Sequence, residues 1–131
     1  MPQYREHQLN RDLRMACELP VGILAAVIMT TDGLLVTSYP PTTDDLDDPT
    51  GGEAVAAMAA VATGSAEQTL DRLRQGNLSR VMIEGNDGTL VIYPATEDAA
   101  LAILVASDAK LGLALATGRR LARTVRDILN G

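Results

Sequence analysis

Residues 50–76 read TGGEAVAAMAAVATGSAEQTLDRLRQG, and the rest of the chain is organised around this stretch. Thr50 followed three residues later by Glu53 is the pattern of a capping box, which predicts that a helix begins here. Every residue from 54 to 62 is apolar, and alanine has the highest helix propensity of all residues. The stretch therefore predicts a long helix that ends at Gly76, a suitable residue to follow a helix.

Two faces of this predicted helix are apolar. One broad face recurs at three- and four-residue spacing and suits packing on a sheet: Val55, Met58, Ala59, Ala62, Ala66, Leu70 and Leu73. The opposite face carries the small residues Ala56, Ala60 and Gly64, and it becomes polar only at Glu67 and Asp71. We expect this flat second face to pack against a second chain. The alternatives are a helix buried within its own domain and a solvent-exposed run of alanines.

The composition indicates a globular protein with few classes of ligand. The chain has 131 residues, which suits one domain, and 47% of them are hydrophobic. The formal net charge of −6 argues against nucleic acid and against an anionic membrane surface as partners. Aromatic residues make up only 2%, so stacking platforms for single-stranded nucleic acid are largely missing.

Cysteine and histidine are too few for a disulfide or a metal cluster, because the chain has only Cys17 and His7. The acidic residues of segment 42–49 lack EF-hand spacing, so we expect a solvated loop. We predict no metal site and no cofactor. The N-terminal residues do not form a signal peptide, and no apolar run is long enough to span a membrane. These features predict a cytoplasmic protein.

The remaining elements follow from apolar runs separated by turn residues. These signals predict two helices, over 4–18 and over 108–129, and Asp108 would cap the second. They also predict five strands, over 23–30, 34–39, 79–84, 89–93 and 99–106. Asp32-Gly33 predicts a type I′ hairpin turn. The first and last strands are apolar on both faces, so helices should cover both faces of the sheet. This predicts a three-layer α/β domain with an antiparallel sheet.

No residue pattern points to catalysis. The sequence contains no Walker A motif and no dinucleotide-binding glycine pattern, and His7 is poorly placed for a catalytic triad. We therefore predict no catalytic residue and no enzyme activity. The basic cluster in the last helix comprises Arg119, Arg120, Arg123 and Arg126. We expect it to be a solvated helix face, with docking of an acidic surface as the alternative.

Five short motifs, taken in order, resemble a known family. They are PVG at 20–22, TDGLLV at 31–36, VMIEG at 81–85, GTLVI at 88–92 and KLGL at 110–113. Together with the alanine-rich helix, their order and spacing resemble a Roadblock domain of the dynein light-chain type. The resemblance covers about residues 9–129, so we expect residues 1–131 to form a single Roadblock-like domain.

The resemblance implies a particular fold and assembly. The expected fold is a five-stranded antiparallel sheet in strand order 2-1-5-4-3, between helices. Its element order is helix, two strands, helix, three strands, helix. Such domains commonly form homodimers in which the third strands pair edge to edge and the central helices lie side by side. The residues that we place at this dimer or partner interface are Ala56, Ala60, Gly64, Glu67, Asp71, Val81 and Ile83.

The resemblance also implies a function. Bacterial relatives act with small Ras-like GTPases, as scaffolds or as activators of GTP hydrolysis, and actinobacterial relatives occur alongside a sensor-kinase-like protein. We therefore expect a non-catalytic, homodimeric signalling regulator of the bacterial branch, which binds a small Ras-like GTPase and modulates its GTP hydrolysis or localisation. The alternative is a small-molecule sensor of PAS-like or profilin-like layout, which would need polar groups that converge on an apolar pocket.

Overall fold

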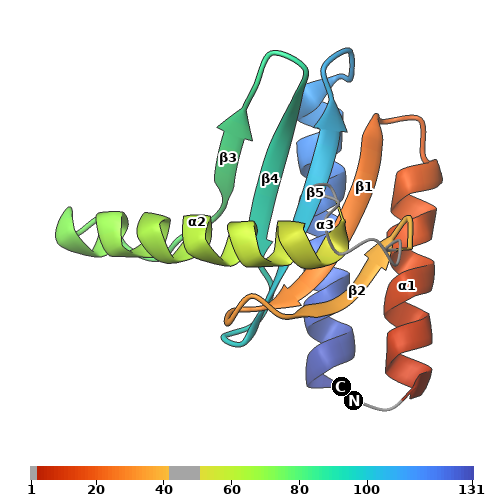
Figure 1. Ribbon diagram of the computed structural model, residues 1–131, viewed down its shortest axis with the longest axis horizontal. Helices are drawn as coiled ribbons and strands as arrows, with labels where there is room; N and C mark the ends of the chain where they lie inside the picture. The colour runs from red at the N-terminus through yellow and green to blue at the C-terminus, as the bar shows by residue number, and fades with distance from the viewer. Residues whose placement is uncertain (1–2, 42–50) are drawn as a thin grey trace.

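The computed structural model describes residues 3–41 and 51–131, which form three helices and a five-stranded sheet. In chain order the elements are α1 (Gln3–Glu18), β1 (Ile23–Thr30), β2 (Leu35–Tyr39), α2 (Gly52–Arg72), β3 (Val81–Glu84), β4 (Gly88–Pro94), β5 (Ala99–Ala106) and α3 (Leu111–Asn130) (Figure 1). The strand order is β2-β1-β5-β4-β3, and all neighbouring strands are antiparallel. The fold that the resemblance implies is confirmed.

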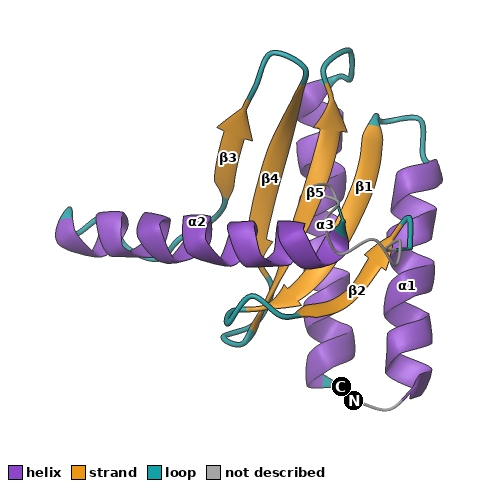
Figure 2. Ribbon diagram, viewed as in Figure 1, coloured by secondary structure: helices purple, strands orange, loops and turns teal. Residues whose placement is uncertain are grey.

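Helices cover the two faces of the sheet unequally. On one face, α1 and α3 lie side by side along the strands, whereas α2 alone crosses the other face (Figure 2). Leu9 and Leu13 of α1 and Val125 of α3 pack with Leu101 and Ile103 of the sheet in the larger core cluster. The first and last strands are buried on both faces over most of their length, because helices lie on both sides of them, as their apolar runs predict; Leu24 and Leu104 are exposed.

The contact between α3 and the sheet is unusually close at Gly118. A Cβ atom at this position would lie 2.7 Å from a ring carbon of Tyr93 and 2.8 Å from Cδ1 of Ile103. The Tyr93 hydroxyl donates to the Leu115 carbonyl at 2.9 Å and so ties β4 to the same helix. Only glycine fits at 118 without displacing its neighbours, which explains a residue that otherwise weakens a helix.

The boundaries of α2 differ from those predicted. Thr50 lies outside the described residues, and the N-cap is Gly51, which has no side chain with which to form a capping box. The helix ends at Arg72 rather than at Gly76, because the chain turns at Arg74 with φ 54°. The amides of Arg74 and Gln75 donate to the carbonyls of Asp71 (3.1 Å) and Leu70 (3.0 Å). This is a Schellman motif, with arginine in the place that glycine usually takes.

Two other local predictions are corrected. The turn at Asp32-Gly33 is not type I′, because only Gly33 has positive φ (90°), and its amide donates to the Thr30 carbonyl at 3.0 Å. These features fit a type I turn followed by a glycine bulge. The N-cap of α3 is Lys110 rather than Asp108, without a side-chain capping bond. Both corrections concern ends of elements and leave the order of elements unchanged.

Among the described residues, no helix is both long enough and apolar enough to cross a membrane. The acidic segment lies between β2 and α2, and its residues 42–49 are outside the described part of the chain.

Candidate protein–protein interface

Strand β3 is an open edge of the sheet, since it pairs only with β4. Met82 and Ile83 are 42% and 49% exposed. The Gly85 amide donates to the Gly88 carbonyl at 2.9 Å, and hydrogen-bonded pairs alternate along an antiparallel ladder. The backbone N–H and C=O groups of Met82 and Glu84 therefore point away from β4, toward the open edge. An open edge with exposed apolar side chains is a template for pairing with another strand.

The second half of α2 extends beyond this edge (Figure 1). The last buried residue of the helix is Thr63, and residues 64–73, which we call the overhang, contain none. A Cβ atom at Gly64 would meet no atom within 4 Å. The apolar stripe that packs on the sheet at Ala59 nevertheless continues past the edge as Ala66, Leu70 and Leu73, the last 61% exposed. The overhang thus has an apolar underside with no strand of its own chain beneath it.

The sheet face on the α2 side is only partly covered. Helix α2 packs over Val27, Ile92 and Ala102. It crosses only part of the sheet (Figure 1), and the next cross-strand row is less buried. That row follows from the strand register and consists of Ile83, Leu90, Leu104 and Ala25. We call these four residues the exposed row, because Ile83 and Leu104 are exposed and the other two are only half-buried. Contiguous exposed apolar surface of this kind marks interaction sites.

The structure brings most of the predicted interface residues to this region. Gly64, Glu67 and Asp71 are all exposed and line one groove along the overhang. Val81 is half-buried beneath α2, and Ile83 belongs to the exposed row. The overhang, the β3 edge and the exposed row are therefore adjacent and form one continuous surface.

Ala56 and Ala60 need a correction. Ala56 is 0% exposed and packs in the core between α2 and its own sheet, so it does not lie on a free face. A Cβ atom at Gly33 would lie 3.3 Å from Cβ of Ala60 and 3.4 Å from Cα of Ala57. The small residues do allow a backbone to approach closely, as predicted. At this end of the helix, however, that backbone is the chain's own turn between β1 and β2.

Sequence reasoning missed the exposed residues Met58 and Val61 of α2, the second 71% exposed. It assigned Met58 to the inner face because the helix is apolar nearly all round, so the pattern does not fix the rotation of the helix about its axis. Placing Ala56 and Ala59 inside turns Met58 and Val61 outward, on the same side of the sheet as the exposed row.

The described residues offer little for chemistry at this surface. They contain no group of three or more His, Cys, Asp or Glu side chains placed to hold a metal ion. Cys17 lies on α1, on the other face of the sheet, where it packs against the larger core cluster. Burial, with a smaller contribution from Glu18, raises the pKa of the Cys17 thiol to about 11. The thiol is therefore protonated at neutral pH and is a poor nucleophile.

Comparison with known proteins agrees with the fold. Residues 20–105 match the Roadblock/LC7 domain family. An uncharacterized protein of Methanocaldococcus jannaschii is 33% identical over 105 residues, which cover 80% of this chain and 86% of that one. A Roadblock/LC7 domain from Streptomyces avermitilis is similar in structure, with a TM-score of 0.80, 20% identity and coverage of 93% and 98% of the two chains. MglB of Myxococcus xanthus has a TM-score of 0.84 at 13% identity, with coverage of 99% and 93%. The chain belongs to the Roadblock/LC7 domain family.

Proposed function

We propose that this chain is a non-catalytic, homodimeric regulator that binds a small Ras-like GTPase. Membership of the Roadblock/LC7 family makes this role the expected one. The observation that carries the proposal is the open β3 edge beside an overhanging helix, because neither feature is completed by the chain itself. A sensor-kinase-like protein is a further partner that the family resemblance implies.

Dimerisation through β3 would complete both features together. If β3 pairs with β3 of a second copy, the sheet continues under the overhang. The helix rises about 1.5 Å per residue, so Thr63 to Leu73 extends about 15 Å, the width of about three strands. Ala66, Leu70 and Leu73 would then pack on the partner's sheet.

The charges beside β3 favour one register for this pairing. A two-fold axis perpendicular to the sheet keeps both α2 helices on one side, so only residues on the same face can lie opposite each other. With the axis at Met82, Val81 lies opposite Ile83 of the partner subunit, and Arg80 lies opposite Glu84 of the partner subunit. Cross-strand pairs of opposite charge stabilise a sheet by about 0.2–1 kcal/mol each. The outward N–H and C=O groups of Met82 are then hydrogen-bonded across the axis.

The GTPase would bind on the α2 side of this dimer. The outer side chains of Met58 and Val61 provide an apolar surface there that the proposed dimer contact does not use. In this register the exposed row instead lies beneath the overhang of the partner subunit. A regulator that binds one nucleotide state more tightly shifts its partner toward that state. In this family of partners the nucleotide state is displayed by the switch loops. The mechanism is therefore differential binding, with no catalytic group supplied by this chain.

Binding to a Ras-like GTPase from the same genome tests the proposal. The GTPase, loaded with GDP or with a non-hydrolysable GTP analogue, is immobilised, and binding of the chain is measured by interferometry. We expect one nucleotide state to bind at least tenfold more tightly. Val61→Glu should weaken this binding at least tenfold and leave the dimer intact. Leu113→Glu is the matched control, because Leu113 is also an exposed helical residue but lies on α3, across the sheet. Equal binding of both nucleotide states, or equal loss in the two variants, would contradict the proposal.

The alternative of a small-molecule sensor would need an apolar pocket between sheet and helix, and the centre of α3 leaves no room for one. At Gly118, α3 and the sheet approach so closely that even a methyl group would overlap with Tyr93.

A further inference from the structure

A small cavity lies on the other face of the sheet, between α3 and the ends of β3 and β4. Its volume is about 170 Å³. The residues that line it are Ser79, Arg80, Tyr93, Pro94, Ala95, Arg119, Ala122, Arg123 and Arg126. Four of these nine residues are arginines and none is acidic, in a chain whose net charge is −6. This concentration of positive charge is the least expected electrostatic feature of the described surface.

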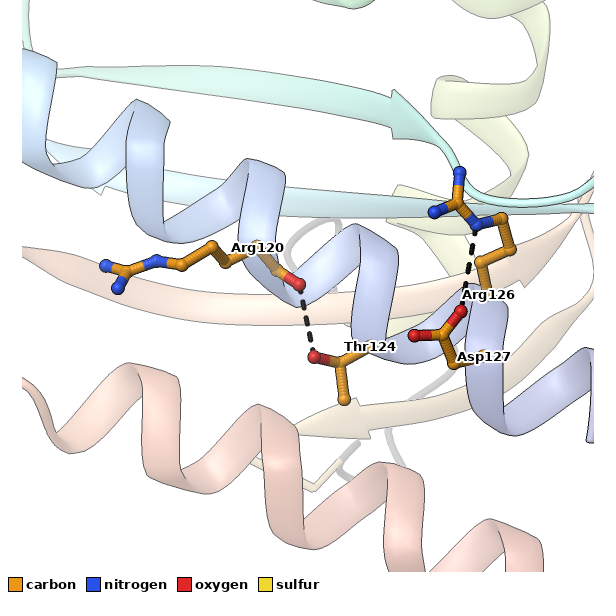
Figure 3. A network of polar contacts seen from close by, with 4 residues as sticks. All are labelled: Arg120, Thr124, Arg126 and Asp127. Atoms are coloured by element: carbon orange, nitrogen blue, oxygen red, sulfur yellow. Dashed lines mark hydrogen bonds and ion pairs between the residues drawn. The ribbon is translucent and has the colours of Figure 1, made fainter.

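The four arginines come from two elements. Arg119, Arg123 and Arg126 are spaced by four and three residues, so they lie on one side of α3. Arg80 comes from the segment just before β3, distant in sequence. Arg120 belongs to another side of the helix: Figure 3 shows the side chains of Arg120 and Arg126 leaving α3 in different directions. Arg120 is thus separated from the other three arginines of α3, and the fold brings Arg80 beside those three.

Helix electrostatics account for only part of this arrangement. Cations near the C-terminus of a helix are favourable, which explains Arg126. Arg80 lies outside the helix, and Arg119 lies near its middle. Within the described part of the chain, Arg80, Arg119 and Arg123 form no ion pair. Arg126 has only Asp127, with Nε and Oδ1 4.0 Å apart and both side chains largely exposed. Four positive charges held together with one exposed carboxylate beside them repel one another, and an anion would relieve that repulsion.

Tyr93 lines this cavity, and the hydrogen bond of its hydroxyl group is known. Burial raises the pKa of the Tyr93 hydroxyl, and the positive charges of Arg80 and Arg119, which line the same cavity, oppose that rise. The hydroxyl proton is already donated to the Leu115 carbonyl. Donors available to a ligand are therefore the four guanidinium groups and the Ser79 hydroxyl, with Pro94, Ala95 and Ala122 as apolar walls.

We propose that this cavity binds the phosphate group of a small ligand. Guanidinium groups bind phosphate oxygens in pairs through two parallel N–H donors, and arginine remains charged throughout the physiological pH range. The cavity is smaller than the roughly 300–1,000 Å³ typical of drug-sized ligands, so it fits a single phosphate group with little attached to it. The site lies across the sheet from the proposed GTPase surface, and its three α3 arginines take no part in the proposed dimer contact; Arg80 alone is shared with it.

The test is a titration with inorganic phosphate at constant ionic strength, with chloride as the balancing anion. Binding is measured by calorimetry and by amide shifts of Arg80 and Arg119 in NMR spectra. We expect saturable binding that Arg123→Gln weakens at least tenfold. Arg120→Gln is the matched control, because it removes the same charge from the same helix but outside the cavity; we expect less than a twofold effect. Circular dichroism checks that both variants remain folded.

Two further arms identify the ligand chemistry and its source. Acetate should not compete with phosphate, because a planar monoanion leaves most of the donors unused. Vesicles of phosphatidylcholine with phosphatidic acid test for a lipid headgroup as the source of the phosphate group. If the chain sediments with these vesicles and Arg123→Gln abolishes the sedimentation, the phosphate belongs to a lipid headgroup. If the chain does not sediment with them, the phosphate belongs to a soluble ligand. Absence of saturable phosphate binding, equal weakening by the two variants, or binding of acetate as tight as that of phosphate would overturn the proposal.

Discussion

The two edge strands of the sheet, β2 and β3, differ in how far the rest of the chain covers them. At β2, helix α1 packs against the strand, and Asn10 Nδ2 donates to Thr37 Oγ1 at 3.1 Å and to the Ser38 carbonyl at 3.0 Å. At β3, Met82 and Ile83 are exposed, and the backbone groups of Met82 point outward. Natural sheets cover or block edges that are not used for pairing. The chain thus closes the β2 edge itself and leaves the β3 edge open, as the proposed dimer requires.

Among substitutions at the two edges, Met82→Pro should have the largest effect on dimer affinity. Proline removes an outward-pointing N–H without disturbing the pairing with β4, so the monomer should stay folded. In the interface it removes a hydrogen bond and adds a steric clash, at a cost of about 3 kcal/mol or more, on both sides of the two-fold axis. We expect the dissociation constant of the dimer to rise by more than about 100-fold. Light scattering measures the dimer, and circular dichroism checks the fold.

The overhang should contribute less than the edge. Leu73→Ala removes an exposed side chain that the proposed dimer buries, and burial of a leucine contributes about 1.5–3 kcal/mol. We expect the dimer to weaken at least about tenfold, with the denaturation midpoint of the monomer unchanged. Leu19→Ala serves as control, since Leu19 is similarly exposed but lies just after α1, distant from β3. If both variants dissociate like the wild type, the overhang does not contact a second chain.

At the β2 edge, a substitution should affect folding and leave assembly unchanged. Asn10→Leu removes both hydrogen bonds from α1 to β2, which should destabilise the chain by about 1–3 kcal/mol. Chemical denaturation measures the loss, and exposed Arg11→Ala is the control. A dimer that weakened in parallel with folding would show that the two edges are not independent.

Arg74→Gly is expected to have a smaller, stabilising effect at the end of the overhang. Arg74 has positive φ, which costs a residue with a side chain about 1–2 kcal/mol, partly offset by the greater freedom of glycine in the unfolded chain. We expect a gain of about 0.5–1 kcal/mol in thermal unfolding. Arg72→Gly, at the last residue of the helix, should instead destabilise by up to about 1 kcal/mol. Destabilisation in both variants would argue against the observed helix end.

A change of pH should have the smallest effect on the protein. Through the ionisation of Cys17, it tests whether α1 stays packed on the covered side of the sheet. Burial raises the pKa of this thiol to about 11, from about 9 for an exposed thiol. The protonated thiol is thus favoured in the folded chain, and its contribution to stability is present below pH 9 and lost as the pH rises through 11. We expect alkylation by iodoacetamide at pH 8 to be roughly 100-fold slower in the folded chain than in urea. Equal rates would mean that α1 does not stay packed.

Much of the fold could be predicted from the sequence, for physical reasons that particular residues illustrate. Apolar runs such as 23–30 and 99–106 are short, strong signals, and the structure confirms both strands. Strand order did not follow from these patterns; it came from the family resemblance, because pairing is decided by contacts between distant segments. The ends of α2 and the cap of α3 were wrong, because an end depends on local backbone geometry that several residue types can adopt, as Arg74 shows.

The candidate site could be predicted only in part. Glu67, Asp71 and Ile83 were expected at an interface and are exposed beside the open edge. Ala56 was assigned to the wrong face, since a helix that is apolar all round carries no signal for its rotation. Arg80 was missed as a neighbour of the arginine cluster, because only the folded sheet brings it to α3. The bacterial branch, the GTPase and the dimer itself stay predictions.

Disulfide formation across the two-fold axis tests the central claim most directly. In a Cys17→Ser background, Met82→Cys would place two thiols on residues that lie opposite each other, with Cα atoms about 5.5 Å apart, within the range of a disulfide. Ile83→Cys is the control, because in this register it lies opposite Val81 of the partner subunit. The account predicts that mild oxidation converts the Met82→Cys chain into a covalent dimer much faster than the Ile83→Cys chain. A dimer in solution that cross-links at neither position, or faster at 83 than at 82, would contradict it.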